Sequence, residues 1–133
     1  MAYVTSATTK GGRNGRAMLD NGALALAMAA PKEIGGAGDG HNPEQLFALG
    51  WSSCYCQALM LIAKKHGIDA QAAKVTCEVT LNTEGGFNLA AELKISVPGA
   101  DKAKVQAAAD EAHTVCPYSK ATKGNIPVKL TVI

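Results

Sequence analysis

Two segments of alternating apolar and polar side chains, joined by a short turn, constrain the fold of this chain most. Apolar residues occupy every second position in residues 75–81 and again in residues 87–97. A period of two gives a β-strand one apolar face. The glycine-containing connection 83–86 is short enough to join the two strands. We therefore predict an antiparallel hairpin with one face turned towards a core.

Four further strands and two helices complete the predicted fold. Turn residues such as Asn21-Gly22 bound the strand segments, and the helical segments carry apolar residues at helical spacing. The predicted strands are residues 2–9, 16–19, 23–29 and 128–132, and the predicted helices are residues 42–66 and 101–115. The glycine-rich residues 31–41 are expected to form a long loop. This order predicts an α+β protein in which a mostly antiparallel sheet packs on two main helices.

Local signals define the ends of the predicted helices. Asn42 can cap the first helix, with a proline following it and Gln45 where a capping box requires it. Gly67 is expected to end this helix. The second helix is expected to end at Cys116, because Pro117 disfavours helical geometry in the residue before it.

Length and composition indicate one globular domain, residues 1–133. The chain has 133 residues, of which 47% are hydrophobic and 18% charged, and a formal net charge of +2. No dense basic stripe is present, so nucleic acid is not an expected partner. The longest uninterrupted apolar run, residues 23–30, is too short to cross a bilayer, and residues 1–10 lack a signal-peptide pattern. We therefore expect a cytoplasmic protein without a membrane partner, in which cysteines stay reduced.

The four cysteines are the candidates for chemistry. Cys54 lies on the apolar face of the first helix, whereas Cys56 lies about 200° further round it. That face comprises Phe47, Gly50, Cys54, Ala58, Leu61 and Ile62. Cys77 belongs to the apolar face of a strand, where a cysteine is most often a small core residue. Position alone leaves open whether Cys54 and Cys116 are catalytic or pack in the core.

The histidines offer a weaker alternative. His113 and Cys116 lie three residues apart and can face the same side of a helix as two zinc ligands. No second pair has matching spacing, so a zinc-stabilised domain is the less favoured interpretation. His66 is better explained as a cation near a helix C-terminus.

Five motifs, in the same order, resemble the organic hydroperoxide resistance (Ohr) family, a branch of the Ohr/OsmC group. They are residues 11–16 (GGRNGR), 31–38 (PKEIGGAG), 42–48 (NPEQLFA), 53–55 (SCY) and 115–119 (VCPYS). The resemblance covers nearly the whole chain, and the CPYS motif with residues 123–126 favours the Ohr branch. The polar Ser52-Ser53 and the Cys56-Gln57 pair depart from the usual pattern. The second departure raises the question of whether Cys56 takes part.

The resemblance implies a thiol-dependent peroxidase that needs no bound cofactor and no metal. Cys54 would attack the peroxide, Cys116 would resolve the product as a disulfide, and Arg13 and Glu44 would assist Cys54. An intertwined homodimer is also implied, as is re-reduction by a dithiol such as the lipoyl group of a lipoylated protein.

Physical chemistry fits these implied roles. A thiol reacts as thiolate, and the ordinary pKa of about 8.5 leaves most cysteines protonated at neutral pH. Arg13, in a glycine-rich turn, can supply a fixed cation because a guanidinium keeps its proton. Glu44 can hold that guanidinium through two hydrogen bonds. The apolar residues expected to favour an alkyl or fatty-acyl hydroperoxide over hydrogen peroxide are Phe47, Tyr55, Leu61 and Ile62.

Two other functions stay open. One is an OsmC-like peroxidase with a broader range of peroxides. The other is a non-catalytic thiol that serves as a redox sensor or binding module.

Helix geometry constrains how Glu44 can assist Cys54. In one unbroken helix the two residues would lie about 15 Å apart along the axis and roughly 80° apart around it. Either the helix breaks between them, near Gly50, or Arg13 and Glu44 reach the sulfur of a second subunit. We favour the second option.

Overall fold

The hairpin predicted from the alternating segments forms the centre of residues 47–133. The computed structural model describes all 133 residues, which divide into two compact units, Met1–Leu46 and Phe47–Ile133. In the second unit, β4 (Lys74–Asn82) pairs antiparallel with β5 (Asn88–Ser96), and Cys77 lies opposite Leu93. The predicted hairpin is confirmed.

The third strand of this sheet pairs in the opposite sense. β6 (Val128–Val132) runs parallel to β5 and gives the strand order β4-β5-β6. A parallel neighbour requires a crossover, and here the helices between the two strands provide it. The α+β class is confirmed, and the sheet of this unit is mixed.

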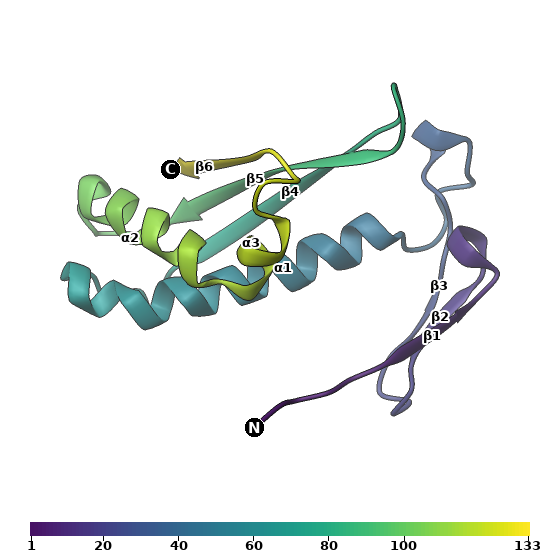
Figure 1. Ribbon diagram of the computed structural model, residues 1–133, viewed down its shortest axis with the longest axis horizontal. Helices are drawn as coiled ribbons and strands as arrows, with labels where there is room; N and C mark the ends of the chain where they lie inside the picture. Colours follow the sequence, from purple (N-terminus) through teal and green to yellow (C-terminus); the bar gives the residue numbers. More distant parts are fainter. The chain divides into compact units, whose positions relative to one another are not determined.

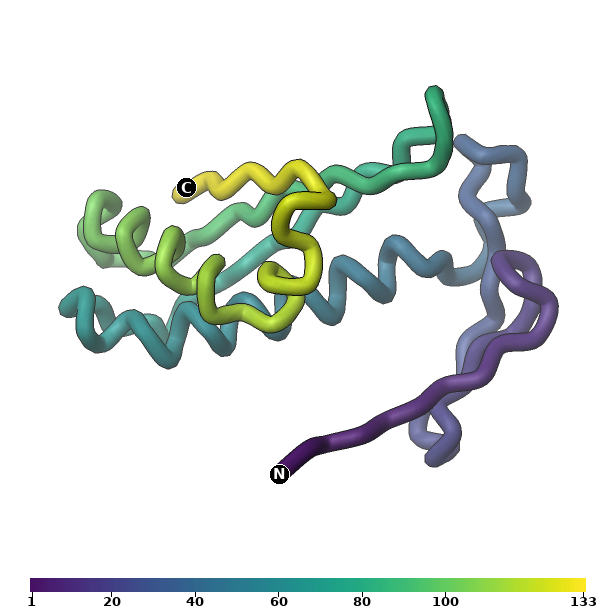
Figure 2. Tube along the Cα trace, viewed as in Figure 1, coloured from purple at the N-terminus to yellow at the C-terminus, as the bar shows by residue number.

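Two long helices cover one face of that sheet. They are α1 (Pro43–Ala63) and α2 (Lys102–Val115), and the parts of both in this unit lie side by side (Figures 1 and 2). The hydroxyl of Tyr55 in α1 donates to the carbonyl oxygen of Ala109 in α2 at 2.5 Å. This hydrogen bond joins the two helices inside the core.

The first helix begins and ends as predicted. Asn42 and Gln45 form a reciprocal capping box, with backbone-to-side-chain distances of 2.9 and 3.0 Å. A short 3₁₀ turn, Lys64–His66, follows the helix, and Gly67 ends it with a φ of 70°. Because α1 is one helix from Pro43 to Ala63, the break considered near Gly50 is absent.

The second helix ends at Cys116, but a third helix that the sequence analysis missed begins directly after it. Asp101 caps α2 by accepting from the backbone N–H of Lys104. Cys116 is the last cap of α2 and the first cap of α3 (Pro117–Thr122). Proline ends a helix before itself, yet its fixed φ also suits the first position of a new one. The prediction of a helix end at Cys116 rested on the first of these effects alone.

The buried face of α1 differs from the predicted one. Its buried residues are Trp51, Tyr55, Ala58, Leu59, Ile62 and Ala63. Leu61 was predicted to face inward, but its side chain is 68% exposed. The large aromatic rings of Trp51 and Tyr55, four residues apart, set the buried face, and Cys54 lies partly exposed at its edge. They pack against residues of β5 and α2 that include Leu93, Ile95 and Ala108.

One helical stretch meets the length and composition of a membrane span. Residues 43–66 are long and apolar enough on those two criteria alone. The sequence-based prediction that no segment is long enough to cross a bilayer counted only uninterrupted apolar runs. It therefore did not include this stretch, which polar residues interrupt. A core helix meets the same criteria, and Trp51, Tyr55 and Leu59 are fully buried by protein. We therefore interpret α1 as a core helix.

The first unit contains a three-stranded antiparallel sheet in the order β1-β2-β3. Its strands are β1 (Ala7–Lys10), β2 (Arg16–Leu19) and β3 (Ala25–Ala27), and 3₁₀ turns form at Gly12–Asn14 and Lys32–Ile34. β1 and β3 are shorter than predicted. Only Met28, Ala29 and Ala30 of this unit are buried. A sheet with so small a core needs further packing to be stable.

Candidate active site

Two free thiols face one another in the second unit. The Sγ atom of Cys116 lies 3.5 Å from the Sγ atom of Cys54, to which its thiol donates. Cys54 comes from the middle of α1, and Cys116 comes from the junction of α2 and α3. A disulfide requires about 2.05 Å between the sulfur atoms. The pair is therefore a reduced dithiol whose members need move only slightly to form a bond.

The surroundings of Cys54 oppose its ionisation. Burial raises the pKa of its thiol, the backbone amide of Tyr118 lowers it, and the neighbouring Cys116 raises it again. Burial is the largest of these effects. A thiolate at this position therefore needs a positive charge beside it to become a major species at neutral pH.

The first unit contains an ion pair between the guanidinium of Arg13 and the carboxylate of Glu44. Nη1 and Nη2 of Arg13 donate to the two carboxylate oxygens of Glu44 at 2.8 and 2.6 Å. This pairing lowers the pKa of Glu44 and raises that of Arg13. The turn that carries Arg13 depends on Gly15, because a Cβ atom there would lie 1.8 Å from the carbonyl oxygen of Lys10.

The four candidate catalytic residues thus form two pairs. Cys54 meets Cys116 in the second unit, and Arg13 meets Glu44 in the first. Both residues of each pair lie in the same unit. The first offers dithiol–disulfide chemistry, and the second offers a fixed cation with an oriented fork of N–H donors.

An aromatic surface lies on α1 one to two turns before Cys54. Phe47 packs edge-on against Trp51, with ring centroids 5.3 Å apart, and stacks with Tyr118 at 6.4 Å. Gly50 makes room for this arrangement, because a Cβ atom there would lie 3.0 Å from the Tyr118 ring. Tyr118 was not among the predicted site residues, although it belongs to the CPYS motif.

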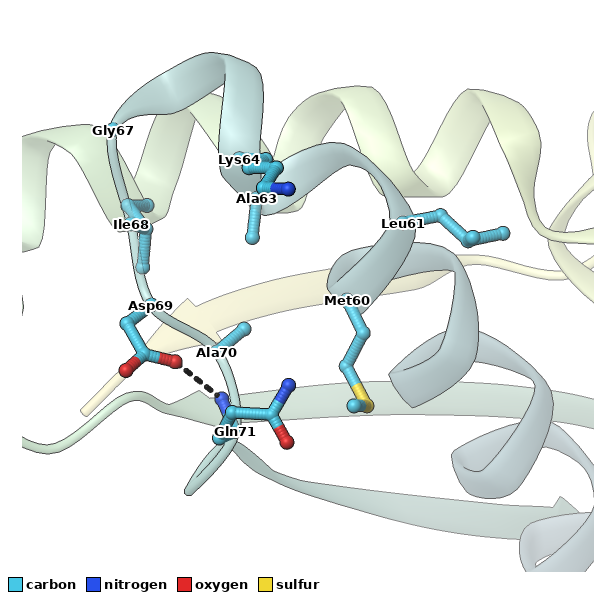
Figure 3. Close-up of a pocket in the computed structure, with 9 residues that line it drawn as sticks. All are labelled: Met60, Leu61, Ala63, Lys64, Gly67, Ile68, Asp69, Ala70 and Gln71. Carbon is cyan, nitrogen blue, oxygen red and sulfur yellow. Dashed lines mark hydrogen bonds between the residues drawn. The ribbon is translucent and has the colours of Figure 1, made fainter.

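The other three predicted substrate-binding residues lie elsewhere. Tyr55 is fully buried and Ile62 is 9% exposed, so both belong to the core. Leu61 borders a pocket of about 580 Å³ at the C-terminal end of α1. The pocket is lined by Met60, Leu61, Ala63, Lys64, Gly67, Ile68, Asp69, Ala70 and Gln71, and Leu61 extends away from the loop that closes it (Figure 3). No cysteine lines this pocket.

The remaining cysteines and histidines have structural surroundings. Cys77 is buried in β4, and burial raises the pKa of its thiol to about 11. Cys56 is free and partly exposed. His66 pairs with Glu111 of α2 at 2.6 Å, and His113 lies 2.8 Å from the hydroxyl of Ser119. No group of three or more potential metal ligands gathers anywhere in the chain.

Fold and site together define an α+β protein with a reduced dithiol between its main helices. Residues 36–131 match the OsmC-like protein family. The chain is 45% identical to an organic hydroperoxide resistance protein of Xanthomonas axonopodis pv. citri, over 98% of this chain and 94% of that protein. This protein belongs to the OsmC-like family.

Two solved structures share the fold along the whole chain. An organic hydroperoxide resistance protein from Legionella pneumophila superposes with a TM-score of 0.91 at 40% identity, covering 99% of this chain and 98% of that one. A second, from Elizabethkingia anophelis with thiocyanate bound, gives a TM-score of 0.89 at 45% identity, covering 99% and 96%. The resemblance to the Ohr/OsmC group noted in the sequence is confirmed.

We expect Glu44→Gln to change how the free energy of unfolding depends on pH. The folded-state pKa of Glu44 is lowered, so its ion pair contributes fully above the ordinary glutamate pKa of about 4.3. That contribution is lost as the pH falls through the lower, folded-state pKa. The variant should be less stable at pH 7, by at most about 1 kcal/mol for a partly exposed pair, and should lose less stability on acidification.

Urea unfolding between pH 7 and pH 3.5, at one protein concentration, measures this. Glu33→Gln is the matched control, because Glu33 is an exposed carboxylate of the same unit that forms no ion pair. An acid dependence for Glu44→Gln equal to that of the wild type would contradict the prediction.

Proposed function

We propose that this protein is a cytoplasmic, thiol-dependent peroxidase that reduces organic hydroperoxides to alcohols. The observation that supports it most is the free Cys54–Cys116 pair, with 3.5 Å between the sulfur atoms. Two thiols at this separation can be oxidised to a disulfide with little movement of the backbone. The names of the relatives point to the same class of substrate.

The proposed cycle has three steps. The Cys54 thiolate attacks one peroxide oxygen, the O–O bond breaks, and the alkoxide leaves as the alcohol after taking up a proton. This converts Cys54 to a sulfenic acid. Cys116 then attacks the Cys54 sulfur, a disulfide forms, and water leaves. An external dithiol, for which we propose the lipoyl group of a lipoylated protein, reduces the disulfide and is itself oxidised.

Arg13 is proposed to stabilise the Cys54 thiolate. Burial raises the pKa of Cys54, and a guanidinium beside the sulfur would lower it without itself losing a proton. Glu44 would hold the guanidinium in a fixed orientation through its two hydrogen bonds. The cation would also attract the polar end of a hydroperoxide.

We propose that Arg13 and Glu44 act on Cys54 of a partner subunit in a homodimer. The unbroken α1 places residues 44 and 54 about 15 Å apart along its axis and roughly 80° apart around it. Three observations support intertwined subunits: the first unit has a small core, Leu49 is 67% exposed, and Leu61 is 68% exposed. Apolar surface of this kind is stabilised when a second copy covers it.

An apolar substrate is favoured by the aromatic residues near the dithiol. Phe47 and Tyr118 stack beside α1, and Tyr118 follows Cys116 by two residues. Tyr118 is 41% exposed, so part of this surface is open to a ligand. An alkyl or fatty-acyl chain gains free energy from contact with such a surface, and hydrogen peroxide does not.

Two measurements separate this function from its alternatives. Intact mass after one equivalent of an alkyl hydroperoxide should show the loss of two hydrogens, whereas a non-catalytic binding module should keep its mass. Stopped-flow rates should be much higher for alkyl hydroperoxide than for hydrogen peroxide. Equal rates would favour an OsmC-like peroxidase with a broad range of peroxides.

Cys54→Ser is expected to reduce peroxidase activity to the uncatalysed level, because no other thiol faces Cys116. Consumption of an alkyl hydroperoxide in the presence of dihydrolipoamide measures this. Cys56→Ala is the matched control on the same helix and should keep activity near that of the wild type, as should Cys77→Ala. Substantial turnover by Cys54→Ser would assign the attack to another cysteine.

Cys116→Ser is expected to react once with peroxide and then stop. Without the second thiol, Cys54 should accumulate as a sulfenic acid and advance to sulfinic acid in excess peroxide. Mass spectrometry of the peptide containing Cys54 measures both products. Continued turnover with a dithiol and no sulfinic acid would exclude the resolving role of Cys116.

Hybrid dimers test whether the site is shared between subunits. Cys54→Ser and Arg13→Ala chains are each expected to be inactive. Unfolded together and refolded, they should regain roughly a quarter of wild-type activity, because half of the randomly paired dimers are hybrids with one intact site of two. Each variant refolded alone is the control. Hybrids that form, as mass spectrometry reports, but remain inactive would show that the site lies within one chain.

A further inference from the structure

Three polar side chains connect the helices that carry the two cysteines. The indole N–H of Trp51 donates to the Oγ atom of Ser119 at 3.2 Å. The same Oγ atom lies 2.8 Å from Nδ1 of His113. Trp51 is fully buried and Ser119 is 1% exposed, so the bond between them forms away from water, whereas the bond to His113 is partly buried. None of the three residues belongs to the proposed chemistry.

Their spacing relates each of them to a cysteine. Trp51 lies three residues before Cys54 on α1, and His113 lies three residues before Cys116 on α2. Three residues correspond to about one helical turn. Ser119 lies three residues after Cys116, on α3. One hydroxyl group therefore joins all three helices around the thiol pair.

The donors and acceptors of the three side chains can all be satisfied at the Ser119 hydroxyl. An indole N–H can only donate, so the Ser119 oxygen accepts from Trp51. The hydroxyl proton of Ser119 is then available for an unprotonated Nδ1 of His113, and the second lone pair of the same oxygen can instead accept from a protonated Nδ1. Burial lowers the pKa of His113, which favours the neutral ring.

The junction that carries Cys116 is held to α1 by two kinds of contact, the stacking of Tyr118 on Phe47 and the hydrogen bond of Ser119 with Trp51. The backbone N–H of Cys116 bonds to Ala112 and its carbonyl oxygen accepts from Lys120, which are the ordinary bonds of α2 and α3. α3 has only six residues. The hydrogen bond between Ser119 and Trp51 is the buried polar contact that holds α3 to α1.

We propose that Trp51, Ser119 and His113 are positioning residues that hold Cys116 in line for condensation with the Cys54 sulfenic acid. This proposal rests on the proposed peroxidase function. In that step the Cys116 sulfur attacks the Cys54 sulfur, the S–S bond forms and the S–O bond breaks. Hydroxide leaves and becomes water with the proton from the Cys116 thiol. The three residues supply geometry and exchange no atoms with the reacting groups.

The consequence is a competition between two fates of the sulfenic acid. Condensation with Cys116 protects Cys54, whereas a second peroxide molecule converts it to sulfinic acid. A misplacement of about 1 Å can slow a reaction step by as much as 10²-fold. Loosening the network should therefore slow condensation and increase sulfinic acid, and should leave the first attack by Cys54 nearly unchanged.

Ser119→Ala tests this directly, because it removes only the shared hydroxyl. Rapid-quench mass spectrometry on the full protein, with an alkyl hydroperoxide, measures the first oxidation and disulfide formation separately. We expect a first step within about twofold of wild type and condensation slower by roughly tenfold or more. The ratio of sulfinic acid to disulfide at high peroxide should rise by a similar factor. Thr114→Val is the control, because Thr114 is an exposed hydroxyl residue of α2 whose hydroxyl bonds only within its own helix.

Conservative variants test whether slower condensation comes from a misplaced Cys116 or from a general loss of stability. His113→Asn keeps an acceptor close to the Nδ1 position and should condense nearly as fast as the wild type, whereas His113→Leu should resemble Ser119→Ala. Trp51→Phe keeps an aromatic ring and removes the donor, which gives a second measurement if Ser119→Ala fails to fold. Urea unfolding of each variant records any loss of stability.

The outcomes distinguish this inference from the function on which it rests. If the wild type forms no Cys54–Cys116 disulfide with the hydroperoxide, the proposed function is wrong. If the wild type forms the disulfide, and the folded variants condense at its rate with its sulfinic fraction, the positioning role is wrong. Equal slowing of both steps, or equal effects of His113→Asn and His113→Leu, would also overturn it.

Discussion

The close approach of α1 and α2 is the constraint on which the dithiol depends. The buried face of α2 consists mainly of alanines, with Ala108, Ala109 and Ala112 fully buried. Such short side chains let the backbone of a neighbouring helix come near. The hydroxyl of Tyr55 uses this proximity to reach the carbonyl oxygen of Ala109 at 2.5 Å. A cysteine side chain is short, so two of them can touch across helices only when the helices are this close.

The break at Pro117 complements this packing. Cys116 follows the buried Ala112 by four residues and so continues the buried face of α2. It stands at the corner between α2 and α3, where its side chain is fully buried and meets Cys54. The same corner brings the Tyr118 amide into the environment of the Cys54 sulfur and its ring against Phe47. Pro117, which begins α3, therefore helps to set the positions of Cys116 and Tyr118.

Much of this could be predicted from the sequence, and the failures have physical causes. Alternation predicted β4 and β5, and the capping residues predicted where α1 begins, because these signals are local. The predicted inward orientation of Leu61 in α1 was wrong, because periodicity alone does not show which of two apolar helix faces packs against the sheet. α3 was missed because a proline can both end and begin a helix. The Trp51–Ser119–His113 network joins residues up to 68 positions apart in the chain, a proximity that no local pattern contains.

The burial of Cys54 has two opposite consequences for the chemistry that we propose. Burial at the edge of the core gives the dithiol its fixed geometry, and the same burial raises the pKa of Cys54. Each pKa unit corresponds to about 1.4 kcal/mol favouring the inactive thiol. A cation beside the sulfur would recover that free energy. We propose that the Arg13 guanidinium, oriented by its two hydrogen bonds with Glu44, supplies this charge.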